Sequence, residues 1–284
     1  MTSPDATCGR LPPRPRRGLF ESPGAPPADR RSRVRGGRLA WPVCAGAALV
    51  RLVGFAVAAA AAALLTGCSK APAEDDYFPL ESGRIWRYRV TTMLDDHAPA
   101  VETMQIVSRG PENMGGDPAV RRHVDSGIDY WIRSDKTGVY RIASKTPLDR
   151  FAMADEPHRY VLQRPYAVGT QWQALTTAYV LQRRSEVPKE IRRTHKPFAM
   201  TYTIEALAET VETPAGKFER CLRVGGRAAV RVYVDAQFAW RDIGLTAREW
   251  YCPGVGLARV EREELSPSRF MLGGKLVIEL TDWR

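Results

Sequence analysis

The residues Leu65-Thr66-Gly67-Cys68 place a thiol directly after small residues at the end of an apolar run. The run is rich in alanine, extends from Leu52 to Leu65, and follows the basic residue Arg51. An apolar segment of about 7–15 residues, with positive charge in front and small residues at its end, is typical of a cleavable secretory signal. The pattern predicts export of the chain and places Cys68 at the site of cleavage.

An uncleaved membrane anchor is the alternative, because residues 39–50 are also largely apolar. A spanning helix needs about 20 consecutive apolar residues and tolerates a central arginine poorly. Arg51 divides the apolar residues into two shorter segments. The sequence therefore favours the signal peptide.

The four residues Leu65–Cys68 resemble the lipobox of bacterial lipoproteins. The resemblance implies that the thiol of Cys68 takes a diacylglyceryl group and that the signal is cut before it. Acyl chains, palmitate among them, would then hold Cys68 on a membrane, because each buried methylene contributes about 0.8 kcal/mol. Ser69 stands where the family's inner-membrane retention signal has aspartate. The resemblance thus implies the outer membrane, on its periplasmic face.

Composition divides the chain into four regions. Residues 1–50 begin with a Pro-, Gly- and Arg-rich stretch that cannot bury a core. They are either a disordered leader or lie upstream of the true start of translation, which would then be near Val50. Residues 51–67 form the signal peptide, and residues 68–76 a polar tether. Residues 77–284 form the folded domain.

Charge gives no support for a nucleic-acid partner. The whole chain has a net charge of +10, but ten arginines against three acidic residues in residues 1–67 account for +7 of it. The remaining +3 belongs to residues 68–284, where basic and acidic residues nearly balance. Binding to a phosphate backbone would require a strongly basic surface.

Two cysteines remain after Cys8 and Cys44 leave with the leader and Cys68 is acylated. The remaining pair, Cys221 and Cys252, could form a disulfide, which an oxidising envelope permits. The same two residues could also be separate buried thiols, because cysteine packs as a small hydrophobe. The sequence leaves both interpretations open.

No pattern of residues indicates an enzyme, a metal site or a cofactor. The four histidines His97, His123, His158 and His195 form no pair at metal-ligand spacing, and no phosphate-binding or nucleophile motif occurs. Several carboxylates could be paired only in three dimensions: Asp125, Asp129, Glu261, Glu263 and Glu264. Because Glu261 and Glu263 share a strand face with Arg259 and Arg262 as neighbours, a solvated charged face is favoured over a catalytic pair.

Alternation of apolar and polar residues predicts strands almost throughout the domain, as in residues 84–92, where Trp86, Tyr88 and Val90 share a face. Further strands are expected at 101–108, 119–125, 128–134, 138–143, 158–163, 176–184, 199–208, 218–224, 228–235, 246–252, 257–264 and 275–282. Turns are expected at Gly115-Gly116, 135–138, 214–216, Gly225-Gly226, Pro253-Gly254 and Gly273-Gly274. A short helix is expected at 148–156.

Two segments of the domain carry recurring patterns, Val211–Val224 with Thr-Pro-Ala-Gly-Lys-Phe and Glu249–Leu257 with Trp-Tyr-Cys-Pro-Gly-Val-Gly. Together with Tyr77–Leu80 and Trp86 they resemble the TapB-like family, a β-rich group of uncharacterised envelope lipoproteins. The resemblance covers about residues 77–265. It implies a curved antiparallel sheet rather than an activity.

The expected fold is all-β, with one curved antiparallel sheet or open half-barrel. The concave face of such a sheet could hold an apolar ligand or a protein segment, with aromatic residues partly in the core and partly lining it: Trp86, Tyr88, Trp131, Trp172, Tyr202 and Trp250. The leading hypothesis is a non-enzymatic binding or envelope-structural module. The alternatives are a periplasmic hydrolase with carboxylates on that face and an accessory subunit of an envelope protein complex.

Overall fold

The computed structural model describes residues 75–184, 196–234, 239–266 and 271–284. All of the regular elements in these ranges are β-strands, so the all-β prediction is confirmed. The strands are β1 (Ile85–Leu94), β2 (Ala100–Met114), β3 (Asp117–Val124), β4 (Asp129–Asp135), β5 (Gly138–Lys145), β6 (Met153–Gln163), β7 (Gln171–Thr176), β8 (Gln182–Arg183), β9 (Phe198–Thr213), β10 (Gly216–Tyr233), β11 (Trp240–Cys252), β12 (Gly256–Glu264), β13 (Met271–Leu272) and β14 (Gly274–Trp283).

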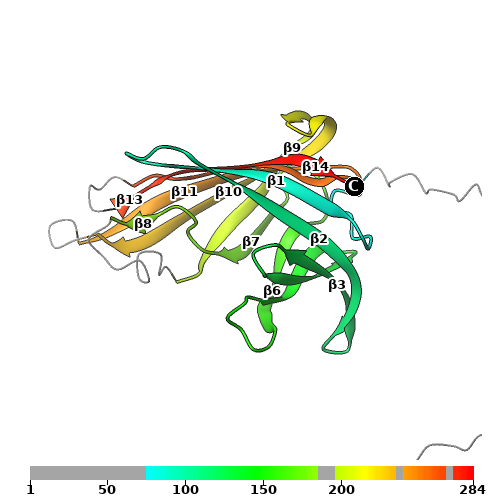
Figure 1. Cartoon of the computed structure of the whole chain (residues 1–284). Helices are drawn as coiled ribbons and strands as arrows, with labels where there is room; N and C mark the ends of the chain where they lie inside the picture. Colours follow the sequence, from blue (N-terminus) through cyan, green and yellow to red (C-terminus); the bar gives the residue numbers. More distant parts are fainter. Residues whose placement is uncertain (1–74, 185–195, 235–238, 267–270) are drawn as a thin grey trace, which may run out of the picture. The chain divides into compact units, whose positions relative to one another are not determined.

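Twelve of the described strands form one antiparallel sheet in the order β6-β5-β4-β3-β2-β1-β14-β12-β11-β10-β9-β7. Neighbours in the sheet are mostly neighbours in the chain, and the pairing of β1 with β14 joins the two halves. Figure 1 shows β3 and β6 turned away from the long strands β10, β11 and β14. The sheet curls until it is nearly closed, since Arg159 Nε on edge strand β6 donates to Leu175 O on edge strand β7, at 2.8 Å.

The expected helix at 148–156 is wrong. Residues 148–152 form a loop and β6 begins at Met153. Asp149 accepts hydrogen bonds from the backbone nitrogen and the hydroxyl of Thr146, at 2.8 and 2.7 Å, which stabilises a tight turn. A turn closed by a side-chain carboxylate competes with helix formation.

The expected hairpin turn at Gly225-Gly226 is also wrong, because β10 runs through both glycines without interruption. The glycines are needed there for space. A Cβ on Gly226 would lie 2.9 Å from Met200 Sδ and 3.1 Å from Tyr202 Cε1 on the paired strand β9. The turns at Pro214-Ala215 and Pro253-Gly254 are present as expected.

The expected strand at 176–184 is correct only at its ends. β7 ends at Thr176, and β8 contains two residues that pair with β13. Between them, residues 177–181 leave the sheet. Their backbone N–H groups bind a buried carboxylate instead, as described below.

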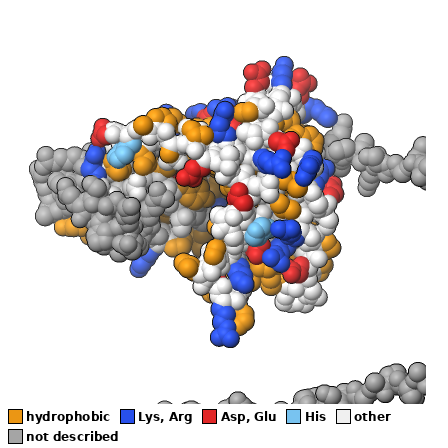
Figure 2. All heavy atoms as spheres, in the orientation of Figure 1, with side chains coloured by type: hydrophobic (Ala, Val, Ile, Leu, Met, Phe, Trp, Pro, Cys, Tyr) orange, Lys and Arg blue, Asp and Glu red, His pale blue; other side chains and the backbone are white. Residues whose placement is uncertain are grey.

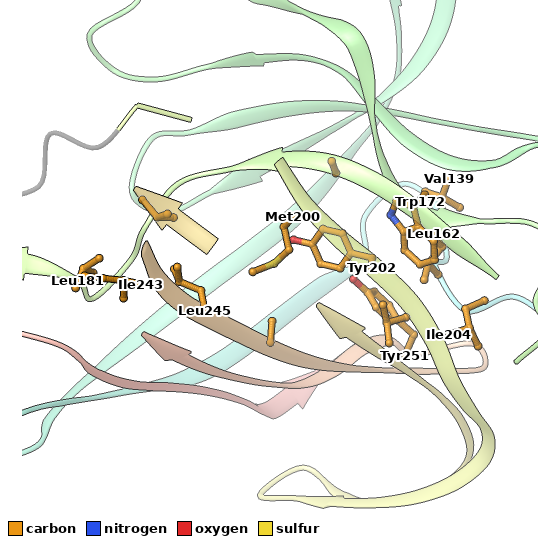
Figure 3. Close-up of a cluster of buried hydrophobic side chains, with 14 of the residues drawn as sticks. Val139, Leu162, Trp172, Leu181, Met200, Tyr202, Ile204, Ile243, Leu245 and Tyr251 are labelled. Carbon is orange, nitrogen blue, oxygen red and sulfur yellow. The ribbon is translucent and has the colours of Figure 1, made fainter. Parts of the chain in front are cut away.

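The largest group of buried side chains fills the concave side of the sheet (Figure 3). It includes Leu162 from β6, Met200 and Ile204 from β9, Leu222 from β10 and Leu245 from β11. A second cluster surrounds Trp86, Tyr88 and the two cysteines, and a third contains Trp131 and Tyr140. Most of the concave side is therefore occupied by the chain itself.

Cys221 and Cys252 form a disulfide between β10 and β11, with the sulfur atoms 2.02 Å apart. Both residues are buried, at 0% and 1% exposure. The bond joins the segments Val211–Val224 and Glu249–Leu257.

The leader, the signal peptide, the lipobox with Cys68, and the first part of the tether lie outside the described residues, which begin at Asp75. The structure therefore does not test these predictions. Within the described ranges, none of the segments is a helix with the length and apolarity needed to cross a membrane.

Candidate ligand-binding pocket

The six aromatic residues expected to lie partly in the core and partly on the concave face belong to three different clusters. Trp172 and Tyr202 stack in the largest cluster, with ring centroids 5.8 Å apart. Trp86 and Tyr88 belong to the second cluster, and Trp250 packs against it while donating its indole N–H to Glu209 at 2.9 Å. The third cluster contains Trp131, whose indole donates to Glu112 at 2.6 Å. Of the six, Tyr202 lines the pocket described next.

A pocket of about 200 Å³ lies between β6 and four strands on the other side of the interior, β9, β11, β12 and β14. Its apolar lining comes from Val161, Leu257, Val260 and Ile278. The remaining lining side chains are polar or aromatic: Arg159, Tyr160, Tyr179, Tyr202, Glu249 and Tyr251. The pocket thus combines an apolar wall with a few polar groups, which is the usual construction of a small-molecule site.

Arg159 supplies the positive charge of the pocket. Its Nε donates to Leu175 O, and among the described residues no carboxylate forms an ion pair with its guanidinium. Burial works against its charge, but the neighbouring tyrosines and Glu249 outweigh burial and raise the pKa of Arg159. A guanidinium has five N–H donors, so most of its capacity is available to a ligand.

Glu249 supplies the negative charge from the opposite side. It accepts a hydrogen bond of 2.5 Å from the hydroxyl of Tyr251, and no ion pair to it occurs within the part of the chain that the structure describes. Burial, and next the charge of Glu249, raise the pKa of both Tyr202 and Tyr251. The two phenols therefore stay protonated and can donate hydrogen bonds.

One wall of the pocket depends on a buried ion pair. Glu264 is 0% exposed and accepts hydrogen bonds of 2.8–3.0 Å from the backbone nitrogens of Tyr179, Val180 and Leu181. Arg262 donates to the same carboxylate and to Thr177 O, and its guanidinium lies 4.0 Å from the centre of the Tyr179 ring. The pair holds segment 177–181 in place, and with it the aromatic ring that lines the pocket.

The recurring sequence segments meet at one end of the sheet. Trp86 Nε1 donates to Val255 O at 2.7 Å, and the hydroxyl of Tyr88 donates to Leu257 O at 3.0 Å. Gly254 N donates to Asp76 O at 2.8 Å. These contacts lock the turn between β11 and β12 against β1 and the start of the domain, which positions Leu257 in the pocket wall.

Arg122 adds to the contacts that hold this end of the sheet together. Its guanidinium lies 3.8 Å from the ring centre of Phe78 and 4.5 Å from that of Trp86, and Nη2 donates to Pro79 O. Burial lowers the pKa of Arg122 to about 10, so the side chain remains charged at neutral pH. The segment Phe78–Pro79 is thereby fixed against β1 and β3.

The carboxylates singled out in the sequence have structural partners. Asp125 accepts from Gln105 N, and Asp129 from Arg121 and His123. Glu261 pairs with Arg259 at 2.8 Å and Glu263 with Lys275 at 2.6 Å, whereas Glu264 is buried as described above.

The described part of the chain has no group of three or more His, Cys, Asp or Glu suited to a metal ion. His195 lies outside the described residues. Basic and acidic side chains are interspersed over the face seen in Figure 2.

Sequence reasoning missed the two charged residues of the pocket. Arg159 lies in a polar run, Glu156-Pro-His-Arg, that does not alternate, and Glu249 lies within a segment interpreted through its turn residues. One signal was available: Glu249 has the same parity as Leu245, Ala247 and Tyr251 and so shares the inward face of β11.

Comparisons with known proteins gave two similar solved structures. A comparison with family models and one with curated proteins found no match. One structure, a "putative lipoprotein" from Parabacteroides distasonis, has 15% identity and a TM-score of 0.35, over 73% of this chain and 98% of that one. Another, a "putative exported protein with YmcC-like fold" from Bacteroides fragilis, has 13% identity and a TM-score of 0.31, over the same shares.

Proposed function

We propose that this chain is a lipid-anchored protein of the bacterial cell envelope that binds a small ligand in the pocket between β6 and β11. The anchor rests on the lipobox-like residues Leu65–Cys68, and the outer membrane on Ser69. The same proposal includes kinship with the TapB-like envelope lipoproteins, which the chain resembles in sequence. The protein acts by binding, without catalysis.

The observation that carries the proposal is the pocket itself, in which Arg159 and Glu249 are both without an ion-pair partner among the described residues. Buried side chains of the described residues occupy most of the concave side. The pocket itself holds about 200 Å³, below the range of roughly 300–1,000 Å³ for drug-sized sites. That size disfavours a whole acyl chain lying along the sheet.

A hydrolase is less well supported. Paired-carboxylate chemistry needs two carboxyl groups free to exchange protons or attack. Glu249 is available, but Glu264 is fully used by Arg262 and three backbone N–H groups. An accessory subunit has one observation in its favour, the exposed side chains of Leu148, Phe151 and Met153, at 96%, 69% and 62% exposure.

Native mass spectrometry of the full chain, extracted from bacterial membranes in mild detergent, tests ligand binding. We expect an additional mass of small-molecule size that is lost on unfolding. A chain that carries no such mass, and that binds no member of a library of envelope metabolites, would contradict the binding function.

Incorporation of labelled palmitate tests the anchor. We expect the wild-type chain to carry the label and Cys68→Ser to lose it, whereas Cys44→Ser, a matched change in the leader, should keep it. Ser69→Asp should move the labelled protein to the inner membrane. Label retained by Cys68→Ser would contradict anchoring at this residue.

A further inference from the structure

We infer that the ligand of this pocket is a zwitterionic amino acid with an apolar side chain, its carboxylate on Arg159 and its ammonium group on Glu249. The inference rests on the proposed function, because it names the ligand class of the same pocket. Four observations carry it: the placement of the two charges, their free hydrogen-bonding capacity, the volume of the pocket and its apolar wall.

The two charges come from opposite sides of the interior. Arg159 is on β6, at one edge of the sheet, and Glu249 is on β11, in the other half. Both line one pocket, and each influences the same tyrosines, but they do not form an ion pair with each other. The space between a guanidinium and a carboxylate that do not meet suits a ligand that carries both opposite charges.

Each charged group has hydrogen-bonding capacity that its protein partners do not use. Arg159 uses Nε on Leu175 O, which leaves its two terminal nitrogens for the two oxygens of a carboxylate. Glu249 accepts from Tyr251, and a carboxylate can accept about four hydrogen bonds. The hydroxyl of Tyr202 has no protein acceptor within the described ranges and is a further donor for the ligand carboxylate.

Size and polarity select among ligands. A volume of about 200 Å³ lies below the roughly 300–1,000 Å³ of sites for drug-sized molecules, and so suits a ligand as small as an amino acid. Val161, Leu257, Val260 and Ile278 form the apolar wall for its side chain. An apolar ligand without charges would desolvate Arg159 and Glu249 without replacing their hydrogen bonds. A simple anion would satisfy Arg159 but would be repelled by Glu249.

Isothermal titration calorimetry on the full chain in detergent tests the inference. The probes are L-phenylalanine, L-leucine and L-isoleucine, followed by N-acetyl-L-phenylalanine, which lacks the ammonium group, and L-phenylalanine amide, which lacks the carboxylate. We expect at least one free amino acid to bind. Its two blocked forms should bind at least about tenfold more weakly, because each loses a hydrogen bond to a charged group.

Variants assign the charges. Glu249→Gln should weaken the free amino acid about tenfold or more and leave the N-acetyl form unchanged. Arg159→Gln should weaken the free amino acid and leave the amide unchanged. Glu261→Gln is the matched control, since Glu261 is on the outward face of β12 and pairs with Arg259. Arg159→Lys keeps the charge and tests binding if Arg159→Gln does not fold.

The outcomes separate the inference from the function on which it rests. If 2-phenylethanol, an uncharged probe, binds as tightly as phenylalanine and Glu249→Gln has no effect, the zwitterion is wrong and the pocket still binds small molecules. The amino acids are tested up to 10 mM, about ten times a weak dissociation constant of 1 mM. If none of the three binds at that concentration while native mass spectrometry reveals another ligand, the inference is likewise overturned. If no ligand of any kind binds, both fail.

Discussion

Asp129 is an ionised residue whose contribution to stability should depend on pH. Burial opposes its charge, but hydrogen bonds from Arg121 and His123 outweigh burial and hold the pKa of Asp129 below its ordinary value of about 3.9. A carboxyl group with a lowered pKa in the folded state stabilises the fold above its unfolded pKa. The contribution disappears as the pH falls through the folded pKa.

Asp129→Asn should therefore lower the free energy of unfolding by about 1.5–3 kcal/mol at pH 6, the range for hydrogen bonds to charged groups. The difference from the wild type should shrink below about pH 4. Urea unfolding at pH 6 and pH 3.5 measures it. Asp117→Asn is the control, because Asp117 pairs with Arg133 but is 61% exposed. A deficit of the same size at both pH values would show that the charge of Asp129 is not the cause.

Glu264 is the residue on which segment 177–181 depends. Glu264→Gln would leave Arg262 without its buried carboxylate and would turn an amide N–H₂ group toward backbone donors. Breaking a buried ion pair by removing one partner costs about 3–5 kcal/mol. We expect a loss of stability in that range by urea unfolding, together with weaker ligand binding, because Tyr179 lines the pocket.

Glu263→Gln is the matched control for Glu264→Gln. Glu263 is the preceding residue in β12 and pairs with Lys275 at 42% exposure. An exposed pair contributes at most about 1 kcal/mol. Equal losses from the two variants would contradict a special role for the buried pair.

For single residues, the sequence shows which side chains carry charge but does not show which partner each one contacts in the fold. Glu261, Glu263 and Glu264 looked alike as part of one charged strand. Their surroundings differ because Glu261 and Glu263 face outward, while the carboxylate of Glu264 enters the interior beside segment 177–181. A period of two separates the faces of a strand, but it does not reveal which polar residue has a buried partner from elsewhere in the chain.

Strand β10 shows how a glycine pair can belong to a strand rather than to a turn. Gly226 is opposite Tyr202 on β9, and the tyrosine ring covers the glycine. Gly226→Val should displace this ring from the pocket and lower the free energy of unfolding by about 1–3 kcal/mol, the usual cost of overpacking a core. Urea unfolding and the calorimetric titration described above measure the two effects.

Gly244→Val is the control for Gly226→Val. Gly244 is in the neighbouring strand β11, and a Cβ built on it meets nothing within 4 Å. A β-branched residue there suits a strand, so we expect unchanged or slightly higher stability. Equal destabilisation by both substitutions would indicate a general intolerance of side chains rather than a contact with Tyr202.

Strands were predictable wherever apolar and polar residues alternate, as at Trp86 and Tyr88 in β1, because one face of the sheet is buried. The predictions of turns and strands failed where one sequence pattern is compatible with two local structures. Paired glycines typify turns, yet Gly225-Gly226 provide room for the side chains of β9. Residues 177–181 resembled a strand, yet Glu264 takes their N–H groups away from the sheet.

At the scale of the whole molecule, closure of the sheet brings together residues far apart in the chain. Arg159 and Glu249, 90 positions apart by their numbers, line one pocket because β6 curls back toward the other half of the sheet. The antiparallel strands were predictable from the alternation and the turns, and their curvature was expected from the family resemblance. The pocket was not, because its lining depends on which edge strands meet and on a segment that leaves the sheet.

The disulfide joins β10 and β11 at one end of the nearly closed sheet, and its location leads to a prediction about redox behaviour. Cys221 and Cys252 are 31 residues apart, and closing a loop of that length stabilises a fold by about 3–4 kcal/mol in the chain-entropy model. The double variant Cys221→Ala with Cys252→Ala should lose stability of that order by urea unfolding. Cys44→Ser, which leaves both Cys68 and the pair intact, is the control.

The native fold should also protect the bond from reductant, because both cysteines are at most 1% exposed. Thiol exchange requires the attacking thiolate to reach a sulfur atom. Mass spectrometry of the exported chain should therefore detect no reduction when dithiothreitol acts on the folded protein for minutes, and a gain of about two daltons, two hydrogens, when it acts after unfolding. A gain without unfolding would mean that this end of the sheet opens readily. Tyr251 precedes Cys252, and Leu257 follows the turn after it, so the pocket wall that these two residues form would then be mobile as well.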